Sequence, residues 1–182
     1  HVFDENGLNL ASFVFGYDQA SSPPTIHKSS VYKGTNIVLS GENSYGEDWC
    51  IIKLDRDVVN IKPIQIRAIN PLRKDDHVYL IGHPRGMPLF VSRGQVVRSS
   101  NSSYYSSLDA FVGNSGSPVF SVKTGKVVGL FVRGKSDFYL GELFSTTNDY
   151  EKSEPIEEFV GISNLEISLK KLTTKKYEKY EN

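Results

Sequence analysis

Short apolar and β-branched runs, separated by turn-forming residues, recur along most of this 182-residue chain. Runs of this kind, bounded by Gly, Pro, Asn and Ser clusters, predict strands rather than helices. They predict strands over residues 13–17, 36–39, 49–54, 63–68, 77–82, 89–98, 118–122, 126–133 and 138–144. Because so many strands must close on themselves or pack against a second sheet, the pattern predicts a β-barrel or a sandwich.

Two local signals support this interpretation. Thr124 and Gly125 separate the runs "PVFSV" and "KVVGLFV", and a Gly at such a position predicts a hairpin because it tolerates positive φ. The run "WCIIKL" is almost continuously apolar, which favours a strand covered on both faces. The segments "QASSPPTIHKSS" and "GENSYGED" are loops by composition.

The end of the chain follows a different pattern. Ser163 and Glu166 have the spacing of a capping box. Three leucines then recur at helical spacing, at positions 165, 169 and 172. The pattern predicts one C-terminal α-helix that begins near residue 164.

Composition excludes several classes of protein. The 21 basic and 21 acidic residues balance, and no basic stripe interleaved with aromatics predicts a nucleic-acid partner. No apolar run approaches the roughly 20 residues of a membrane-spanning helix, so we expect no membrane insertion. The one cysteine, Cys50, excludes an internal disulfide and a multi-cysteine zinc site. We expect no metal and no cofactor, since no phosphate-binding or dinucleotide-binding glycine motif is present.

The stretch "GNSGSP", residues 113–118, places six small or turn-forming residues between apolar runs. It is either an ordinary surface turn or a tight turn that presents Ser115 as a nucleophile. A nucleophilic serine needs a base, a carboxylate that orients the base, and donors for an oxyanion. All four histidines precede Ser115, which excludes the Ser–Asp–His order, and Ser117 stands where the G-x-S-x-G elbow needs its second glycine. The order His–Asp–Ser remains, with Asp48 at a loop-to-strand junction as the carboxylate.

Four stretches resemble the trypsin-like, chymotrypsin-fold serine proteases. "DWCIIKLDR" resembles the strand that carries their catalytic aspartate, and "GNSGSPVF" resembles the nucleophile loop of the glutamyl-endopeptidase-like bacterial branch. "VYLIGHPRGMPLFVSRGQVV" resembles a strand pair of the second barrel in that branch, and "HVFDENG" resembles the residues that begin at the catalytic histidine. Together these stretches cover most of residues 1–145.

The resemblance implies a serine endopeptidase that acts on protein or peptide substrates. It implies that Ser115 is the nucleophile, His1 the general base and Asp48 the residue that orients His1, with the amides of Gly113 and Ser115 as the oxyanion hole. Gly113 and Asn114 suit such a turn, since both tolerate left-handed backbone.

The resemblance also implies an all-β fold of two six-stranded antiparallel β-barrels of the chymotrypsin type, with a C-terminal α-helix. We expect residues 1–62 to be the remainder of the first barrel, without its N-terminal strands. Residues 63–150 would form the second barrel, and residues 151–182 a helical tail. The chain opens at His1 rather than at Met, which suggests a fragment or a processed form. The family resemblance favours a secreted or periplasmic location, and the oligomeric state is open.

Departures from the family pattern leave alternatives. His27 is a second candidate base, although "IHKSSVY" does not match the family. We expect His77 and His83 to be structural. Asn114 stands where digestive trypsins carry Asp, so activation through a new N-terminal amine paired with that carboxylate is excluded for this chain.

Substrate preference rests on fewer residues. Asp109 precedes Ser115 by six positions, where trypsin-like relatives place the carboxylate that binds Lys or Arg; alternatively, Asp109 hydrogen-bonds within its own loop. "VGLFVRGK" resembles the strand that lines the substrate cleft, which implies that Phe131, Val132, Arg133 and Gly134 contact substrate. Phe131 stands where glutamate-specific relatives carry His, which weakens a glutamate-specific interpretation.

Three functional hypotheses follow. The first is a serine endopeptidase, with cleavage after basic residues or after glutamate as the open specificities. The second is a protease-fold binding module with an inactive site. The third, a purely structural β-protein, treats the "GNSGSP" turn and the Asp48 strand as coincidence.

Overall fold

The chain divides into two compact units, His1–Ile64 and Gln65–Asn182. The computed structural model describes residues 5–17, 26–42, 48–66, 71–101, 103–134 and 157–163, apart from the side chains of residues 5 and 42. Within these residues, no helix is long and apolar enough to cross a membrane.

The first unit contains a short helix and two small antiparallel sheets. The helix is α1 (Glu5–Leu10), and a 3₁₀ turn, η1, covers Lys28–Ser30. In one sheet, β1 (Phe13–Val14) pairs with β2 (Val31–Tyr32). In the other, β3 (Gly34–Glu42) pairs with β4 (Asp48–Leu54). Leu8 of α1 is buried against Gly34, where a side chain would collide with it. Sequence patterning missed α1, because six residues are too short for helical periodicity to show.

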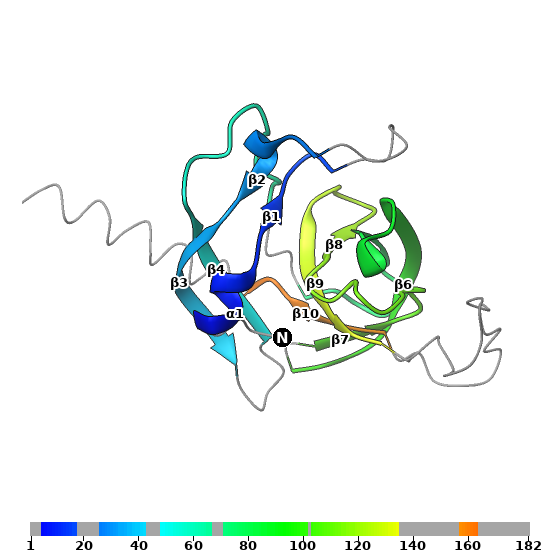
Figure 1. Cartoon of the computed structure of the whole chain (residues 1–182). Helices are drawn as coiled ribbons and strands as arrows, with labels where there is room; N and C mark the ends of the chain where they lie inside the picture. Colours follow the sequence, from blue (N-terminus) through cyan, green and yellow to red (C-terminus); the bar gives the residue numbers. More distant parts are fainter. Residues whose placement is uncertain are drawn as a thin grey trace, which may run out of the picture. The chain divides into compact units, whose positions relative to one another are not determined.

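The second unit is a closed, antiparallel, six-stranded barrel (Figure 1, green to orange). Its strands have the order β10-β7-β6-β5-β8-β9. Their bounds are β5 His77–Gly82, β6 Phe90–Ser100, β7 Ser103–Ser106, β8 Pro118–Ser121, β9 Val127–Arg133 and β10 Glu157–Gly161, with a 3₁₀ turn, η2, at Pro84–Gly86.

The core of the second unit fills this barrel. Alternate residues of a strand share a face, and this alternation is clear in β5, where Val78 and Leu80 are fully buried between more exposed neighbours. Phe159 of β10 is also fully buried and stacks on Tyr104 of β7 with ring centroids 5.2 Å apart. The core cluster comprises Leu72, Val78, Leu80, Val96, Leu108, Ala110, Val119, Val128, Phe131 and Phe159.

The predicted strands agree with the barrel in most places. The prediction for 77–82 coincides with β5, those for 118–122 and 126–133 differ from β8 and β9 by one residue at one end, and that for 89–98 differs from β6 by one residue at its start and two at its end. The Thr124–Gly125 hairpin is confirmed, with Gly125 at φ 65° and its N–H donating to the Ser121 carbonyl at 2.8 Å.

Other predictions need correction. Residues 63–66 form no strand beyond one isolated bridge from Ile66 to Val127. The strands β2, β7 and β10 were missed. The expected tail at 151–182 is wrong where it includes β10, because Glu157–Gly161 pairs with β7 and β9 and completes the barrel. Because two adjacent glutamates begin β10, its sequence does not have the apolar pattern of a buried strand.

Several predictions lie outside the described residues: the strand at 138–144, the helix from about residue 164, and His1. In the first unit, the described residues form two two-stranded sheets rather than a closed barrel, so the first barrel stays a prediction. Among the described residues, the expected two-sided covering of β4 is not met, since only Trp49 of this strand is buried and the others are half-buried or exposed.

Candidate active site

The stretch around Ser115 forms two overlapping tight turns in the connection that leads into β8. The Asn114 N–H donates to the Phe111 carbonyl at 3.2 Å, and the Ser117 N–H donates to the Asn114 carbonyl at 2.8 Å. Gly113 and Gly116 have φ of 98° and 85°. Since side-chain-bearing residues rarely adopt such angles, these two glycines are what allow the turns.

A second turn packs against this one. The 3₁₀ turn η2 brings the backbone of Arg85 so close to Gly113 that a Cβ on Gly113 would lie 2.5 Å from the Arg85 amide nitrogen. Arg85 itself has φ 51° and Gly86 has φ 70°, which keeps η2 tight. The "GHPRG" stretch therefore packs against the Ser115 turn.

Strand β9 is hydrogen-bonded to the Ser115 turn. The Gly116 N–H donates to the Phe131 carbonyl at 2.7 Å, and the Phe131 N–H donates to the Ser117 carbonyl at 2.9 Å. These two hydrogen bonds straddle Ser115 and fix it relative to the barrel.

The Ser115 hydroxyl donates to the Val132 carbonyl at 3.0 Å. Val132 is an extra residue on β9: Glu158 pairs with Arg133 while Phe159 pairs with Phe131, so the register skips it. A β-bulge leaves its extra residue outside the ladder of hydrogen bonds. The bulge thus makes the Val132 carbonyl available to the serine.

The amides at Ser115 differ from those of the neighbouring residues. Asn114, Gly116 and Ser117 each donate a backbone N–H to a carbonyl. Within the described part of the chain, the N–H groups of Gly113 and Ser115 have no carbonyl acceptor. Two available amides beside a serine hydroxyl can receive one external oxygen, as an oxyanion hole does.

Asn114 anchors the turn beneath Ser115. It is fully buried, and its Oδ1 accepts from the Ser117 hydroxyl at 3.5 Å. Gly82, at the end of β5, leaves room for both side chains, since a Cβ there would collide with each. A neutral amide at this position keeps a charge out of the core.

Asp48 begins β4 in the first unit. Its backbone pairs opposite Glu42, and its side chain is half-buried. The following residue, Trp49, is buried against Gly41, which orients the start of the strand. The predicted position of Asp48 at the start of a strand is therefore confirmed, and its role as the carboxylate stays a prediction.

The three histidines other than His1 lie among the described residues. His27 is exposed and precedes η1. The His77 Nδ1–H donates to the Asp75 carbonyl at 3.0 Å, and the His83 Nδ1–H donates to the Met87 carbonyl at 3.1 Å. Because a carbonyl can only accept, Nδ1 is the donor in both contacts.

The family model of the trypsin-like peptidase domain matches residues 1–130. The chain belongs to the trypsin-like peptidase family. A solved structure described as Glu endopeptidase in complex with MPD superposes with a TM-score of 0.64 at 17% identity, covering 89% of this chain and 70% of that one. At that identity the likeness shows a shared chymotrypsin-like fold. No curated protein matches the sequence.

In this trypsin-like peptidase, the residues predicted to contact substrate lie in different environments. Asp109 is exposed, and its amide donates to the Ser92 hydroxyl at 2.8 Å. Among the described residues, its carboxylate has no hydrogen-bond partner in its own loop. The alternative that Asp109 serves mainly to hold that loop through its carboxylate is thus not supported.

The four predicted substrate-contact residues on and after β9 differ in their exposure to solvent. Phe131 is 3% exposed and belongs to the barrel core, and Val132 is buried beside it. The Arg133 Nε–H donates to Glu158 Oε2 at 2.7 Å, in a pair whose side chains are 67% and 8% exposed. Gly134 is exposed, and its Cα lies against the Glu157 carboxylate. The sequence analysis did not single out Glu157 or Glu158. The glycine at position 134 was the sequence signal for Glu157, because a side chain there would collide with its carboxylate.

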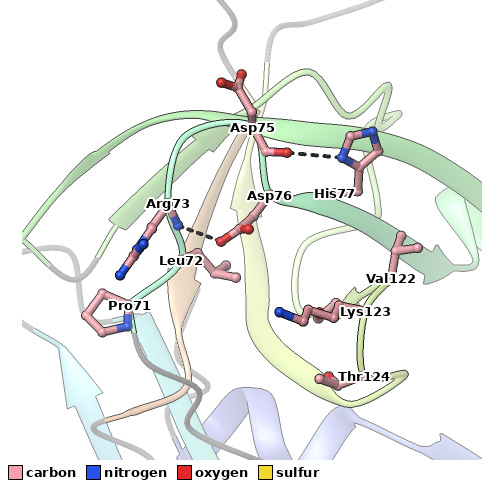
Figure 2. A pocket seen from close by; sticks show the side chains of 10 residues that line it. Pro71, Leu72, Arg73, Asp75, Asp76, His77, Val122, Lys123 and Thr124 are labelled. Carbon is pink, nitrogen blue, oxygen red and sulfur yellow. Dashed lines mark hydrogen bonds between the residues drawn. The ribbon is translucent and has the colours of Figure 1, made fainter.

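A cavity of about 550 Å³ lies at the other end of the barrel (Figure 2). Its lining includes Ser121 and Lys123, which follow the end of β8, whereas Ser115 precedes its start. Figure 2 shows Lys123 directed into it and the Arg73 N–H bonded to the Asp76 carboxylate. This cavity is therefore separate from the Ser115 turn. Within the described residues, no group of three His, Cys, Asp or Glu side chains could hold a metal ion.

Proposed function

We propose that this chain is a serine endopeptidase that cleaves protein or peptide substrates through Ser115. One observation supports the proposal: among the described residues, the amides of Gly113 and Ser115 have no carbonyl acceptor, and they belong to the turn that carries the Ser115 hydroxyl. Membership of the trypsin-like peptidase family and the shared fold support it.

In this proposal, the Ser115 hydroxyl leaves the Val132 carbonyl and attacks the substrate carbonyl carbon while His1 takes its proton. The amides of Gly113 and Ser115 bind the oxyanion. The peptide C–N bond then breaks as His1 returns the proton to the leaving amine. Water hydrolyses the resulting acyl-enzyme by the same route, and Asp48 keeps His1 oriented and stabilises its charged form.

Specificity is proposed separately from the chemistry. A preference for Lys or Arg before the cleaved bond would require a carboxylate near the substrate, and Asp109 is the candidate from sequence. Cleavage after glutamate is less favoured, because Phe131 lies in the core and offers no polar donor.

A protease-fold binding module is the second candidate. The hydrogen bond from Ser115 to the Val132 carbonyl favours it, because a hydroxyl held there is directed at an acceptor other than a base. The two candidates differ in whether the serine reacts.

Labelling with a fluorophosphonate, followed by peptide mapping, tests the proposal. Stoichiometric label on Ser115 is expected, together with peptide-bond cleavage that Ser115→Ala abolishes. Ser99→Ala is the matched control: it removes an exposed hydroxyl from β6 and should leave both readouts unchanged. A folded protein that takes no label would favour the binding module.

A further inference from the structure

The cavity shown in Figure 2 lies between two turns that are fixed by backbone hydrogen bonds. The first turn precedes β5: the Asp76 N–H donates to the Arg73 carbonyl at 3.1 Å, and the Arg73 N–H donates to Asp76 Oδ2 at 2.7 Å. The second is the hairpin after β8, where the Gly125 N–H donates to the Ser121 carbonyl at 2.8 Å. Pairing of β5 with β8 holds the two turns together. The cavity is therefore preformed, as small-molecule sites usually are.

Two opposite charges border this cavity. Figure 2 shows the Lys123 side chain and the Asp76 carboxylate directed into the space between the turns. One Asp76 oxygen accepts from the Arg73 N–H, whereas its other oxygen and the Lys123 ammonium have no hydrogen-bond partner in the described part of the chain. The two side chains also form no ion pair with each other. A carboxylate and an ammonium thus face the same space with bonding capacity left.

The other charged groups of the lining do not face that space in the same way. Figure 2 shows the Arg73 side chain directed away from Lys123 and the Asp75 carboxylate directed away from the cavity. The His77 ring donates to the Asp75 carbonyl through Nδ1. A simple anion or cation would be attracted by one of the two facing charges and repelled by the other, whereas a molecule that carries both charges is attracted by both.

Apolar surface and size narrow the ligand further. Leu72, which belongs to the barrel core, lines the cavity, and Val122, which is 54% exposed, offers apolar surface on the hairpin. The volume of about 550 Å³ falls within the range of about 300–1,000 Å³ typical of sites for drug-sized ligands. These features suit a short apolar peptide better than a single amino acid.

We propose that this cavity binds a short peptide with free termini. The peptide carboxylate would meet Lys123, its ammonium would meet Asp76, and its apolar side chains would pack on Leu72 and Val122. The inference goes beyond the proposed function and does not depend on it, because the cavity is separate from the Ser115 turn. If Ser115 cleaves peptides, the ligand belongs to the chemical class of its products.

An NMR titration of the full chain tests the proposal. The Ser115→Ala variant is used so that the peptide stays intact, and the probe is leucyl-leucine with both termini free. Amide resonances of residues 72–76 and 122–124 should shift, with an affinity in the millimolar range because both charged side chains are exposed. N-acetyl-leucyl-leucine and leucyl-leucine amide, which each lack one charge, should bind about fivefold more weakly, the upper end for an exposed ion pair.

Substitutions assign each charge to its partner. Asp76→Asn keeps an oxygen that can accept from the backbone but removes the charge, so it should weaken binding of leucyl-leucine about fivefold and that of the N-acetylated peptide less than about twofold. Lys123→Met should likewise affect the free peptide and spare the amide. Asp75→Asn and Lys74→Met are matched controls, because the Asp75 carboxylate is directed away from the cavity and Lys74 is not part of its lining. Both should change binding less than about twofold.

Several results would overturn the proposal. Unmoved resonances at the cavity, or capped peptides that bind as tightly as the free one, would do so even if a variant fails to fold, since these measurements need no substitution at the cavity. Equal losses for all three peptides in Asp76→Asn would show a structural role instead of a charge contact. Free leucine binding as tightly as leucyl-leucine would overturn the assignment to a peptide. Reactivity of Ser115 is tested separately by labelling of the wild type.

Discussion

Two glycines of the Ser115 turn offer a matched test of how η2 supports it. Gly113 and Gly116 both have positive φ, so an alanine at either costs about 1–2 kcal/mol in backbone strain. A Cβ at Gly116 meets nothing within 4 Å. A Cβ at Gly113 would lie 2.5 Å from the Arg85 nitrogen, whereas ordinary contact begins at 3.4 Å, so η2 must retreat by about 0.9 Å.

Displacing packed backbone adds about 1–3 kcal/mol, the usual cost of inserting a methyl group into a filled site. We therefore expect Gly116→Ala to lower the free energy of unfolding by about 1–2 kcal/mol and Gly113→Ala by about 2–5 kcal/mol. For a chain of this length, each kcal/mol corresponds to about 2–4 °C in Tm.

Urea unfolding followed by far-ultraviolet circular dichroism measures both variants. The proposed oxyanion hole adds a second readout: moving the Gly113 amide should lower kcat by about 10²–10³, the usual effect of losing one donor. Equal destabilisation by the two substitutions would refute the argument that η2 braces the turn.

Two further predictions concern other parts of the molecule. Phe159→Ala should cost about 3–5 kcal/mol, because Phe159 is fully buried and stacks on Tyr104; a loss below about 1 kcal/mol in urea unfolding would contradict the placement of the core. The Lys33 backbone N–H, aided by Arg56, holds the pKa of the Asp55 carboxyl below its ordinary value of 3.8. Its stabilising effect is therefore complete above the unfolded pKa and is lost as pH falls through the lower folded pKa. Asp55→Asn should remove that part of the acid sensitivity, and an NMR titration midpoint above 3.8 would contradict it.

The sequence alone determined four of the six barrel strands and the presence of a tight turn at Ser115. β5, β6, β8 and β9 are visible as apolar runs, because most of their residues that face the core are apolar. The "GNSGSP" turn is visible because only small residues tolerate its backbone angles. The Thr124–Gly125 hairpin follows for the same reason.

What the sequence could not decide were features created by contacts between distant segments. Glu157 and Glu158 appear solvated, yet β10 closes the barrel, because pairing with β7 and β9 outweighs the local preference of two acidic residues. The contact between Gly113 and Arg85 joins two turns that lie 28 positions apart in the sequence. The skipped register at Val132 depends on how two strands meet. Backbone angles and apolar periodicity are local properties, and a sequence carries them residue by residue. The burial of Glu157 and Glu158 is a property of the closed barrel, and only the tertiary structure reveals it.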